Sequence, residues 1–184
     1  VIKHIPGHGR AGADSHTDLP RVDTKLDELL KVDFYPFQVN ADMPIAMTAH
    51  VLYRAIDKRN PATTSRKCLK IVRDIIGFDG LLITDDLSMN ALFGTLEKRA
   101  KAALRAGVDV ILHCSGQMAE MKSVAHVTPK LKGEGLRRAK AAIKRLLKTP
   151  EPIDVIDARA RFDVVMARGQ DAGAKSDPTE AMPS

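Results

Sequence analysis

The sequence has no tryptophan, two cysteines and no long apolar run. Seven phenylalanine and tyrosine residues leave a mainly aliphatic core. Cys68 and Cys114 lack the spacing of a zinc site and do not form the framework of a disulfide-rich domain. No apolar segment approaches the roughly 18 residues of a membrane-spanning helix, and no signal peptide is recognisable. We therefore expect a cytoplasmic protein with reduced thiols and no membrane partner.

Lysine and arginine outnumber the acidic residues, and the formal net charge is +6. Much of the excess falls in one helix-like stretch, residues 131–148. This stretch has no interleaved aromatic residues and no nucleic-acid-binding motif. We therefore interpret it as the solvated face of an amphipathic helix and expect no nucleic-acid partner.

Four short apolar runs alternate with helical patterns along the chain. Each becomes polar at its carboxyl end, and they cover residues 1–5, 45–51, 80–84 and 108–113. Apolar strands that alternate with helices indicate a parallel sheet covered by helices. The predicted fold class is α/β, a parallel (β/α)8 TIM-type barrel, of which this chain supplies about the last four β/α units. We expect this half-barrel to occupy residues 1–168 and a disordered tail to occupy residues 169–184.

The helices are predicted from apolar residues at helical spacing. The expected segments are residues 24–32, 65–76, 90–106, 136–147 and 153–168. Thr24 with Asp27 is a plausible capping pair for the first helix, and Pro36 is expected to break it. Ser65 or Thr64 is expected to cap the second helix.

A lysine, three histidines and an aspartate lie within the first sixteen residues. Lys3 and His4 end the first strand with donors suited to sugar hydroxyls or an anion, and residues 6–20 form a long loop of a length that is often functional. In Asp14-Ser15-His16 the carboxylate is close enough to fix the imidazole tautomer and raise its basicity. Such a pair can donate a proton and later accept one, although Asp and Ser are also common in turns.

Two adjacent carboxylates, Asp85 and Asp86, follow the apolar run 81–84. They leave a buried strand at the edge where barrels keep their active sites. Aspartates at this point are also frequent helix caps. The two interpretations are compatible, because one carboxylate can cap while the other faces a pocket.

The remaining histidines carry weaker signals. We interpret His8, in Pro-Gly-His-Gly, as structural, whereas His50 and His113 end strands and can either line a pocket or support the fold. A metal site is the competing interpretation, and its ligands would be His4, His8, Asp14 and His16.

Two motifs are together typical of one family. Lys-His-Ile-Pro-Gly-His-Gly at residues 3–9, followed by Asp-Ser-His at 14–16, resembles the signature of glycoside hydrolase family 3 β-N-acetylglucosaminidases. Ile-Thr-Asp-Asp-Leu-Ser-Met at 83–89 resembles the nucleophile stretch of that family. Residues 49–53 and 77–80 are also similar, so the resemblance spans about residues 1–150.

The resemblance implies a retaining β-N-acetylhexosaminidase without a metal or organic cofactor. Asp85 would be the nucleophile, His16 the acid/base and Asp14 the group that orients His16. Lys3 and His4 would bind sugar hydroxyls. The implied substrate is terminal β-linked N-acetylglucosamine in a glycan or muropeptide, removed during peptidoglycan recycling in the cytoplasm.

The first four β/α units of the family have no counterpart in this sequence. A half-barrel has open sheet edges and an unfilled interior. Either the sequence starts within a longer protein, or it is a truncated product that could pair with the missing N-terminal half-barrel or a second copy of itself, or be inactive. The alternatives are a truncated, non-catalytic half-barrel and a metal-dependent hydrolase that uses the histidine cluster.

Overall fold

The computed structural model describes residues 1–146, 149 and 151–171. It divides the chain into two compact units, Val1–Leu147 and Lys148–Ser184. The expected domain boundary at residue 168 differs from this division. Residues 169–171 of the expected tail are helical, and the rest of that prediction lies outside the described residues.

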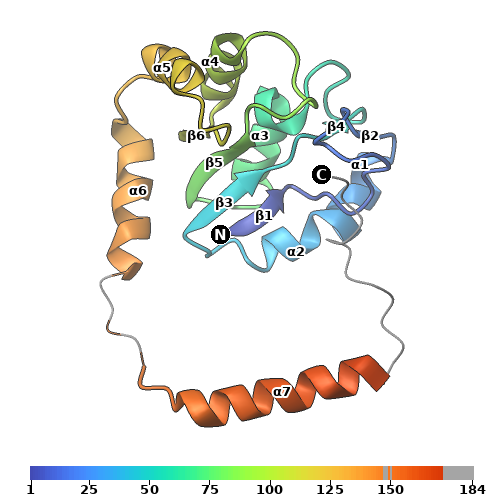
Figure 1. The fold of residues 1–184 in the computed structure, drawn as a ribbon. Coiled ribbons are helices and arrows are strands. Elements are labelled where there is room, and N and C mark those ends of the chain that lie inside the picture. Colours follow the sequence, from blue (N-terminus) through green and yellow to red (C-terminus); the bar gives the residue numbers. More distant parts are fainter. Residues whose placement is uncertain (147–148, 150, 172–184) are drawn as a thin grey trace. The chain divides into compact units, whose positions relative to one another are not determined.

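The first unit is built on a four-stranded sheet. Its strands lie in the order β1 (Ile2–Ile5), β3 (Ile45–Thr48), β5 (Leu81–Asp86) and β6 (Val110–Leu112), and every neighbouring pair is parallel (Figure 1). These are the four apolar runs of the sequence in chain order. The predicted α/β architecture with a parallel sheet is therefore confirmed.

The two faces of the sheet differ in burial. Ala46 and Leu82 are paired in register and fully buried, so their face packs on the helices. The next pair along, Met47 and Ile83, points to the other face because side chains alternate along a strand, and it is only partly buried. Asp85 lies two residues beyond Ile83, so it belongs to this less covered face, which corresponds to the interior of a barrel.

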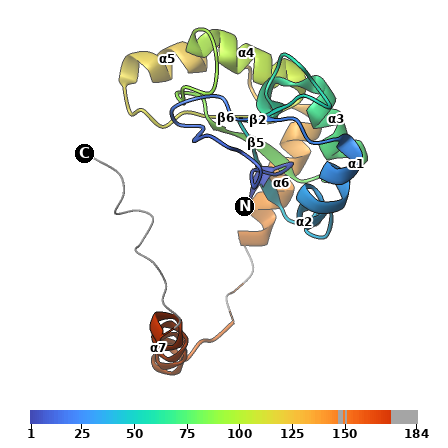
Figure 2. The ribbon, with the colours of Figure 1, turned by 90° about the vertical axis from the view of Figure 1, so that its right-hand side faces the viewer.

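Helices flank the sheet within the first unit. They are α1 (Leu26–Glu28), the π-helix η1 (Leu29–Asp33), α2 (Tyr35–Gln38), the 3-10 helix η2 (Ala62–Thr64), α3 (Arg66–Asp74), α4 (Leu96–Ala106), α5 (Met118–Val127) and α6 (Gly133–Leu146). In Figure 1, α1 and α2 lie on the β1 side of the sheet, whereas α5 and α6 lie on the β6 side; Figure 2 shows the same helices from a second direction. The largest fully buried side chains are Phe34 and Phe78, so two of the few aromatic residues anchor the core.

Two predicted helices are different in the structure. The segment predicted at 24–32 is split into α1 and η1, its first cap is Lys25 without a side-chain bond, and Pro36 lies in the first turn of α2 instead of ending a helix. Proline is tolerated there because the first amides of a helix have no partner within it. The helix predicted from residue 90 begins only at Leu96, because Thr95 provides the cap: its side chain accepts from the Lys98 amide.

Other helix signals are confirmed. The Ser65 side chain accepts a hydrogen bond from the Cys68 amide at 3.2 Å and caps α3. Gly107 ends α4 at a φ of 118°, in the left-handed region that favours glycine. Helix α5 was not among the predicted segments. Most of its residues are apolar but only Val124 is buried, so the sequence shows no clear division into an apolar and a polar face.

A second, two-stranded parallel sheet joins β2 (Arg21–Val22) to β4 (Leu52–Tyr53). It secures the end of the long loop 6–20, and Leu19, Leu52 and Ala91 form a small buried cluster beside it. This sheet was not predicted, because a two-residue strand has no periodicity to detect.

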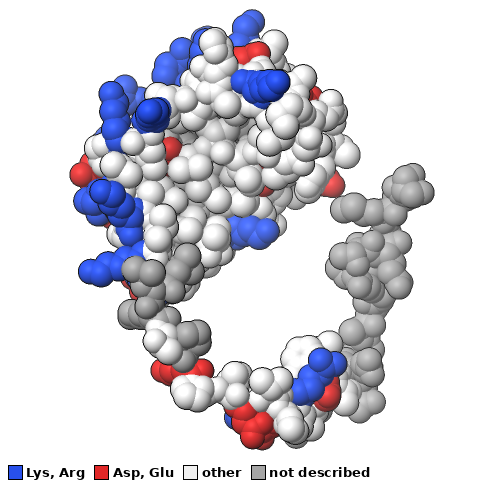
Figure 3. All heavy atoms as spheres, turned by 60° about the vertical axis from the view of Figure 1, so that its left-hand side comes forward, with Lys and Arg blue, Asp and Glu red and all other residues white. Residues whose placement is uncertain are grey.

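The basic helix is more than a solvated face. Arg138 on α6 pairs with Asp79 at 3.0 Å and with Asp109 at 3.2 Å, and its side chain is only 15% exposed. Asp109 also pairs with Arg73 of α3 at 2.9 Å. Figure 3 shows lysine and arginine side chains along the face that contains α6. The interpretation of a solvated face therefore needs correction at Arg138, which anchors the helix to the strand ends.

The second unit contains α7 (Val155–Asp171). Among its described residues, the large apolar side chains Ile156, Phe162 and Val165 are exposed. Across the described parts of both units, no helix combines the length and apolarity needed to cross a bilayer.

Candidate functional site

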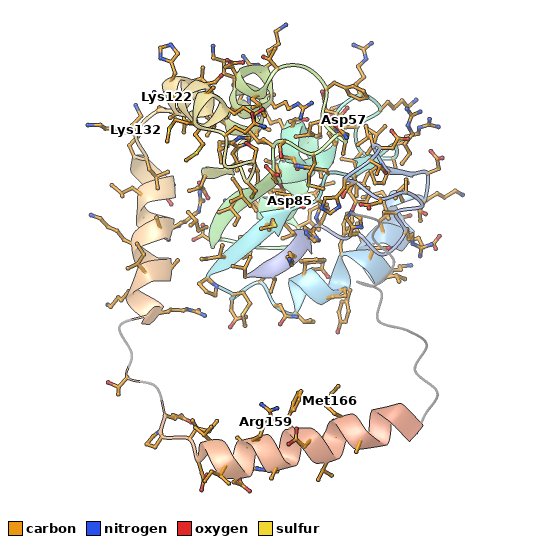
Figure 4. All side chains as sticks on the ribbon, in the orientation of Figure 1. Asp57, Asp85, Lys122, Lys132, Arg159 and Met166 are labelled. Carbon is orange, nitrogen blue, oxygen red and sulfur yellow. The ribbon has the colours of Figure 1, made fainter. Side chains whose placement is uncertain are left out.

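The carboxyl ends of β1 and β5 bring a histidine and an aspartate together across the intervening strand β3. His4 Nε2 lies 3.3 Å from Asp85 Oδ2. The two side chains are 28% and 17% exposed, so both are accessible from the open edge, where Figure 4 labels Asp85. The register of β1 against β3 shifts between Lys3 and Ile5, and His4 reaches Asp85 at this irregularity. The chain therefore places an accessible carboxylate beside an imidazole at the rim.

The surroundings of His4 keep its pKa below the usual value for histidine. Burial lowers the pKa of His4, and although Asp85 opposes the shift, the nearby His8 and Lys3 add to it. The His8 ring lies 5.5 Å from the His4 ring. Asp85 thus has His4 beside its Oδ2, and its Oδ1 accepts the Asp86 amide at 2.9 Å.

Asp86 serves the local turn. Its Oδ1 accepts hydrogen bonds from the amides of Ser88 and Cys114, both at 3.0 Å, and its Oδ2 accepts from the Ser88 hydroxyl. Burial acts to raise the pKa of Asp86, but these hydrogen bonds outweigh it and lower the pKa. The two adjacent aspartates thus have separate environments: Asp86 fixes the strand ends and Asp85 faces His4.

His50 supports the fold. It is 1% exposed, its Nδ1 lies 2.7 Å from the Thr63 hydroxyl, and its Nε2 donates to the Asp86 carbonyl at 3.0 Å. Burial lowers its pKa, so the ring is neutral. The structure answers the question that the sequence left open, because both ring nitrogens are used within the protein.

His113 lies at the tip of β6 in a second polar cluster. Its Nε2 is 3.1 Å from Glu120 Oε2 and 2.9 Å from the Ser115 hydroxyl. Its buried Nδ1 has no hydrogen-bond partner and lies 3.7 Å from Asp86 Oδ1. The cluster joins the end of β6 to α5 and belongs to the support of the rim.

Asp14 and His16 form the predicted pair on the long loop. Asp14 Oδ1 lies 2.8 Å from His16 Nδ1 and accepts the His16 amide at 2.9 Å. These two bonds lower the pKa of Asp14 and leave Nε2 of His16 turned away from the carboxylate. The His16 side chain is 68% exposed, and within the described residues no hydrogen bond or ion pair joins it to Asp85. His4–Asp85 and Asp14–His16 are thus two separate pairs, without a hydrogen bond or ion pair between them among the described residues.

The loop that carries His16 is tied down at its start. Tyr53 donates its hydroxyl hydrogen to the Gly7 carbonyl, and Arg10 pairs with Asp33 at 2.8 Å. His8 Nε2 lies 3.5 Å from the Ser15 hydroxyl, in agreement with a structural role. Lys3 is an exposed residue of β1 and, in the described part of the chain, has no hydrogen bond or ion pair with the site.

The predicted alternative of a metal site is not assembled by this arrangement. Among the described residues, no three histidine, cysteine or acidic side chains come together as a metal site requires. Both cysteines are free, and burial raises the pKa of Cys68 to about 11. His16 is paired with Asp14 on an exposed loop, whereas His4 faces Asp85.

Among the residues that support the rim, sequence reasoning singled out His50 but missed Glu120 and Arg99. His50, Glu120 and Arg99 lie on other elements, and each bonds to backbone or side chains next to the rim. The polar end of the strand run 45–51 signalled His50. No sequence pattern pairs Arg99 or Glu120 with its partners, because these contacts are set by packing.

A parallel α/β sheet with its polar residues at the carboxyl ends of the strands is the arrangement of TIM-barrel enzymes. Residues 1–149 match the glycosyl hydrolase family 3 N-terminal domain, and the chain belongs to this family.

Relatives in this family share both sequence and fold with the chain. A β-hexosaminidase of Bordetella pertussis is 39% identical over 122 residues, which are 64% of this chain and 35% of that protein. A family 3 β-N-acetylglucosaminidase from Paenibacillus sp. has a TM-score of 0.66 at 30% identity, over 84% of this chain and 33% of that one. NagZ from Neisseria gonorrhoeae, in complex with N-trifluoroacetyl-D-glucosamine, has a TM-score of 0.65 at 32% identity, over 80% of this chain and 45% of that one. The chain thus spans about a third of the length of the curated relative.

Proposed function

We propose that this chain carries the catalytic groups of a retaining β-N-acetylhexosaminidase that acts on terminal β-linked N-acetylglucosamine. The observation that carries the proposal is the placement of Asp85: an accessible carboxylate at a strand end, with one oxygen beside His4 and its neighbour Asp86 occupied elsewhere. The β-hexosaminidase relatives and the N-acylated glucosamine bound by the gonococcal protein support the substrate class.

In the proposed reaction, Asp85 is the nucleophile. A carboxylate oxygen of Asp85 attacks the anomeric carbon, the bond to the leaving oxygen breaks, and a covalent glycosyl-enzyme forms. His16 Nε2 gives its proton to the leaving oxygen. In the second step His16 takes a proton from water, which attacks the same carbon and releases the sugar and Asp85.

The roles of the other residues follow from their chemistry. Asp14 accepts from Nδ1 of His16 and so keeps Nε2 available for proton transfer. His4 and Lys3 offer donors to sugar hydroxyls at the end of β1. In the proposed reaction His16 and Asp85 act on the same glycosidic bond, although in this structure each belongs to a separate pair.

The assay uses a chromogenic N-acetylglucosaminide and mass spectrometry to detect the glycosyl-enzyme. Asp85→Asn should lower turnover by about 10³-fold or more and remove the covalent adduct, because an amide is not a nucleophile here. Asp74→Asn, at an exposed carboxylate on α3, is the control and should keep wild-type turnover. Near wild-type activity of Asp85→Asn contradicts the proposal.

The proposal extends to a biological setting. The substrate is an N-acetylglucosaminyl muropeptide, and the reaction is a step of peptidoglycan recycling in the cytoplasm. The test is release of N-acetylglucosamine from purified muropeptides, followed by chromatography, against chitobiose as the comparison substrate. A strong preference for chitobiose contradicts the muropeptide assignment.

A second candidate is a half-barrel that binds sugar or a partner without turnover. The described sheet has four strands, whereas a complete barrel has eight, and this observation favours the candidate. The partner would be an N-terminal half-barrel or a second copy of the chain. Light scattering of the purified chain, together with the chromogenic assay, separates the candidates: binding without turnover in any oligomeric state supports the second.

A further inference from the structure

The segment 87–94 connects the two parts of the proposed site. It begins two residues after Asp85. Farther along, the amides of Asn90 and Ala91 donate to the carbonyls of His16 and Ser15 at 3.4 and 3.3 Å. Ala91 is fully buried against Leu19 at the end of the same loop. The position of this segment therefore sets where the backbone of the Asp14–His16 pair lies relative to β5.

Arg99 on α4 holds this segment at three points. Its Nη1 donates to the carbonyls of Leu87 at 2.7 Å and Met89 at 3.1 Å, and its Nε donates to the Gly94 carbonyl at 3.0 Å. The three carbonyls belong to both ends of the segment. Without the guanidinium, they have no other hydrogen-bond donor among the described side chains.

The guanidinium is suited to this task. Its donors have a fixed planar geometry, so one side chain bonds three carbonyls at once, whereas the single ammonium of lysine is a point donor. No ion pair involves Arg99 in the described part of the chain, so its donors serve the backbone. Burial lowers the pKa of Arg99 and the Asp86 charge opposes that shift.

We propose that Arg99 is a positioning residue that acts through segment 87–94 to hold the loop carrying Asp14 and His16 against the strand that carries Asp85. The importance of this loop rests on the proposed function, whereas the mechanical coupling rests on the contacts alone. Without Arg99 the segment loses three hydrogen bonds and becomes more mobile. The loop then loses its hydrogen bonds to the amides of Asn90 and Ala91.

Hydrogen exchange of the full chain, measured by mass spectrometry, tests the coupling without substrate. R99A should increase the exchange rates of residues 87–94 and 14–19 by about tenfold or more, which corresponds to losing charge-assisted hydrogen bonds. Exchange in α3 and β3 should stay at the wild-type rate. R99K should give a smaller increase in exchange rate, because lysine keeps the positive charge but not the planar arrangement of donors.

R105A is the matched control. Arg105 is an exposed residue of the same helix and makes no hydrogen bond or ion pair within the described residues. The amide exchange rates of R105A at residues 87–94 and 14–19 should equal those of the wild type. Unchanged exchange at 14–19 in R99A, or an equal increase throughout residues 1–146, overturns the proposal. Should R99A fail to fold, R99K carries the test: exchange equal to that of R105A overturns the proposal.

The two proposals fail separately. If Asp85→Asn keeps its turnover while R99A releases the loop, the enzymatic assignment is wrong and the positioning role stands. If Asp85→Asn abolishes turnover while R99A leaves exchange at 14–19 unchanged, the positioning role is wrong and the enzymatic assignment stands.

Discussion

At the scale of single residues, identical side chains have different roles because their neighbours differ. Asp85 and Asp86 are adjacent, yet Asp86 accepts two amides and a hydroxyl whereas Asp85 keeps one oxygen beside His4. His50 and His113 both follow strands and both have partners within the protein, although Nδ1 of His113 has none. The accessible groups that remain are those of the predicted site.

One prediction at this scale concerns proton donation by His16. His16→Ala should lower kcat/KM by about 10²-fold or more for substrates with poor leaving groups, because these need a proton. Activated aryl glycosides should lose much less. His126→Ala, at an exposed position of α5, is the control. Equal losses on both kinds of substrate contradict a role in proton transfer.

At the scale of elements, the helices are fixed at their ends by polar contacts. Asp109 is the centre of one such contact: it pairs with Arg73 of α3 and Arg138 of α6, and it accepts the amide of Leu82 on β5 at 3.0 Å. Its side chain is 8% exposed, so the charges are largely removed from water. One aspartate thus joins two helices to two strands.

Removal of Asp109 should therefore destabilise the first unit. Asp109→Ala leaves two half-buried guanidinium groups without this partner, and we expect a loss of about 3 kcal/mol in the free energy of unfolding. Asp79→Ala, at a 66% exposed carboxylate that pairs with the same Arg138, should cost less than about 1 kcal/mol. Urea denaturation followed by circular dichroism measures both. Equal losses would show that burial of Asp109 is unimportant.

At the scale of the whole molecule, stability depends on carboxylates that accept hydrogen bonds in the folded state. Burial acts to raise the pKa of Asp57 and of Asp86, but hydrogen bonds outweigh it and lower both below their usual value. A carboxyl whose pKa is lower in the folded state stabilises the fold above its unfolded pKa, and this contribution is lost as the pH falls through the folded pKa. Acid unfolding below about pH 4 follows from this.

The corresponding experiment compares the wild type with Asp86→Asn. The difference in their free energies of unfolding should be largest near pH 7 and should shrink below about pH 4, where the wild-type carboxyl also becomes neutral. Thermal or urea unfolding at several pH values measures it. A difference that stays constant down to pH 2.5 contradicts the assigned role of the Asp86 charge.

Local signals in the sequence predicted much of the fold. The four apolar runs became the four strands, and Ser65 and Gly107 mark helix ends, because burial and backbone conformation act on a few consecutive residues. The split of residues 24–33 into α1 and a π-helix, and the late start of α4, depend on packing that periodicity does not record. The site residues stay a prediction: Lys3, His4 and Asp85 lie toward strand ends, whereas Asp14 and His16 lie on the long loop.

The sequence by itself determined the parallel α/β fold, the family, and the residues that could carry the chemistry, since these depend on residue type and spacing. Only the tertiary structure decided which residues meet. It brought His4 beside Asp85 across β3 and directed the Asp86 carboxylate to the amides of the turn and of Cys114. It also placed the Arg99 guanidinium on the segment whose amides bind the loop of His16. The physical reason is that these contacts join residues distant in the chain, and their energies exist only after the strands have come together.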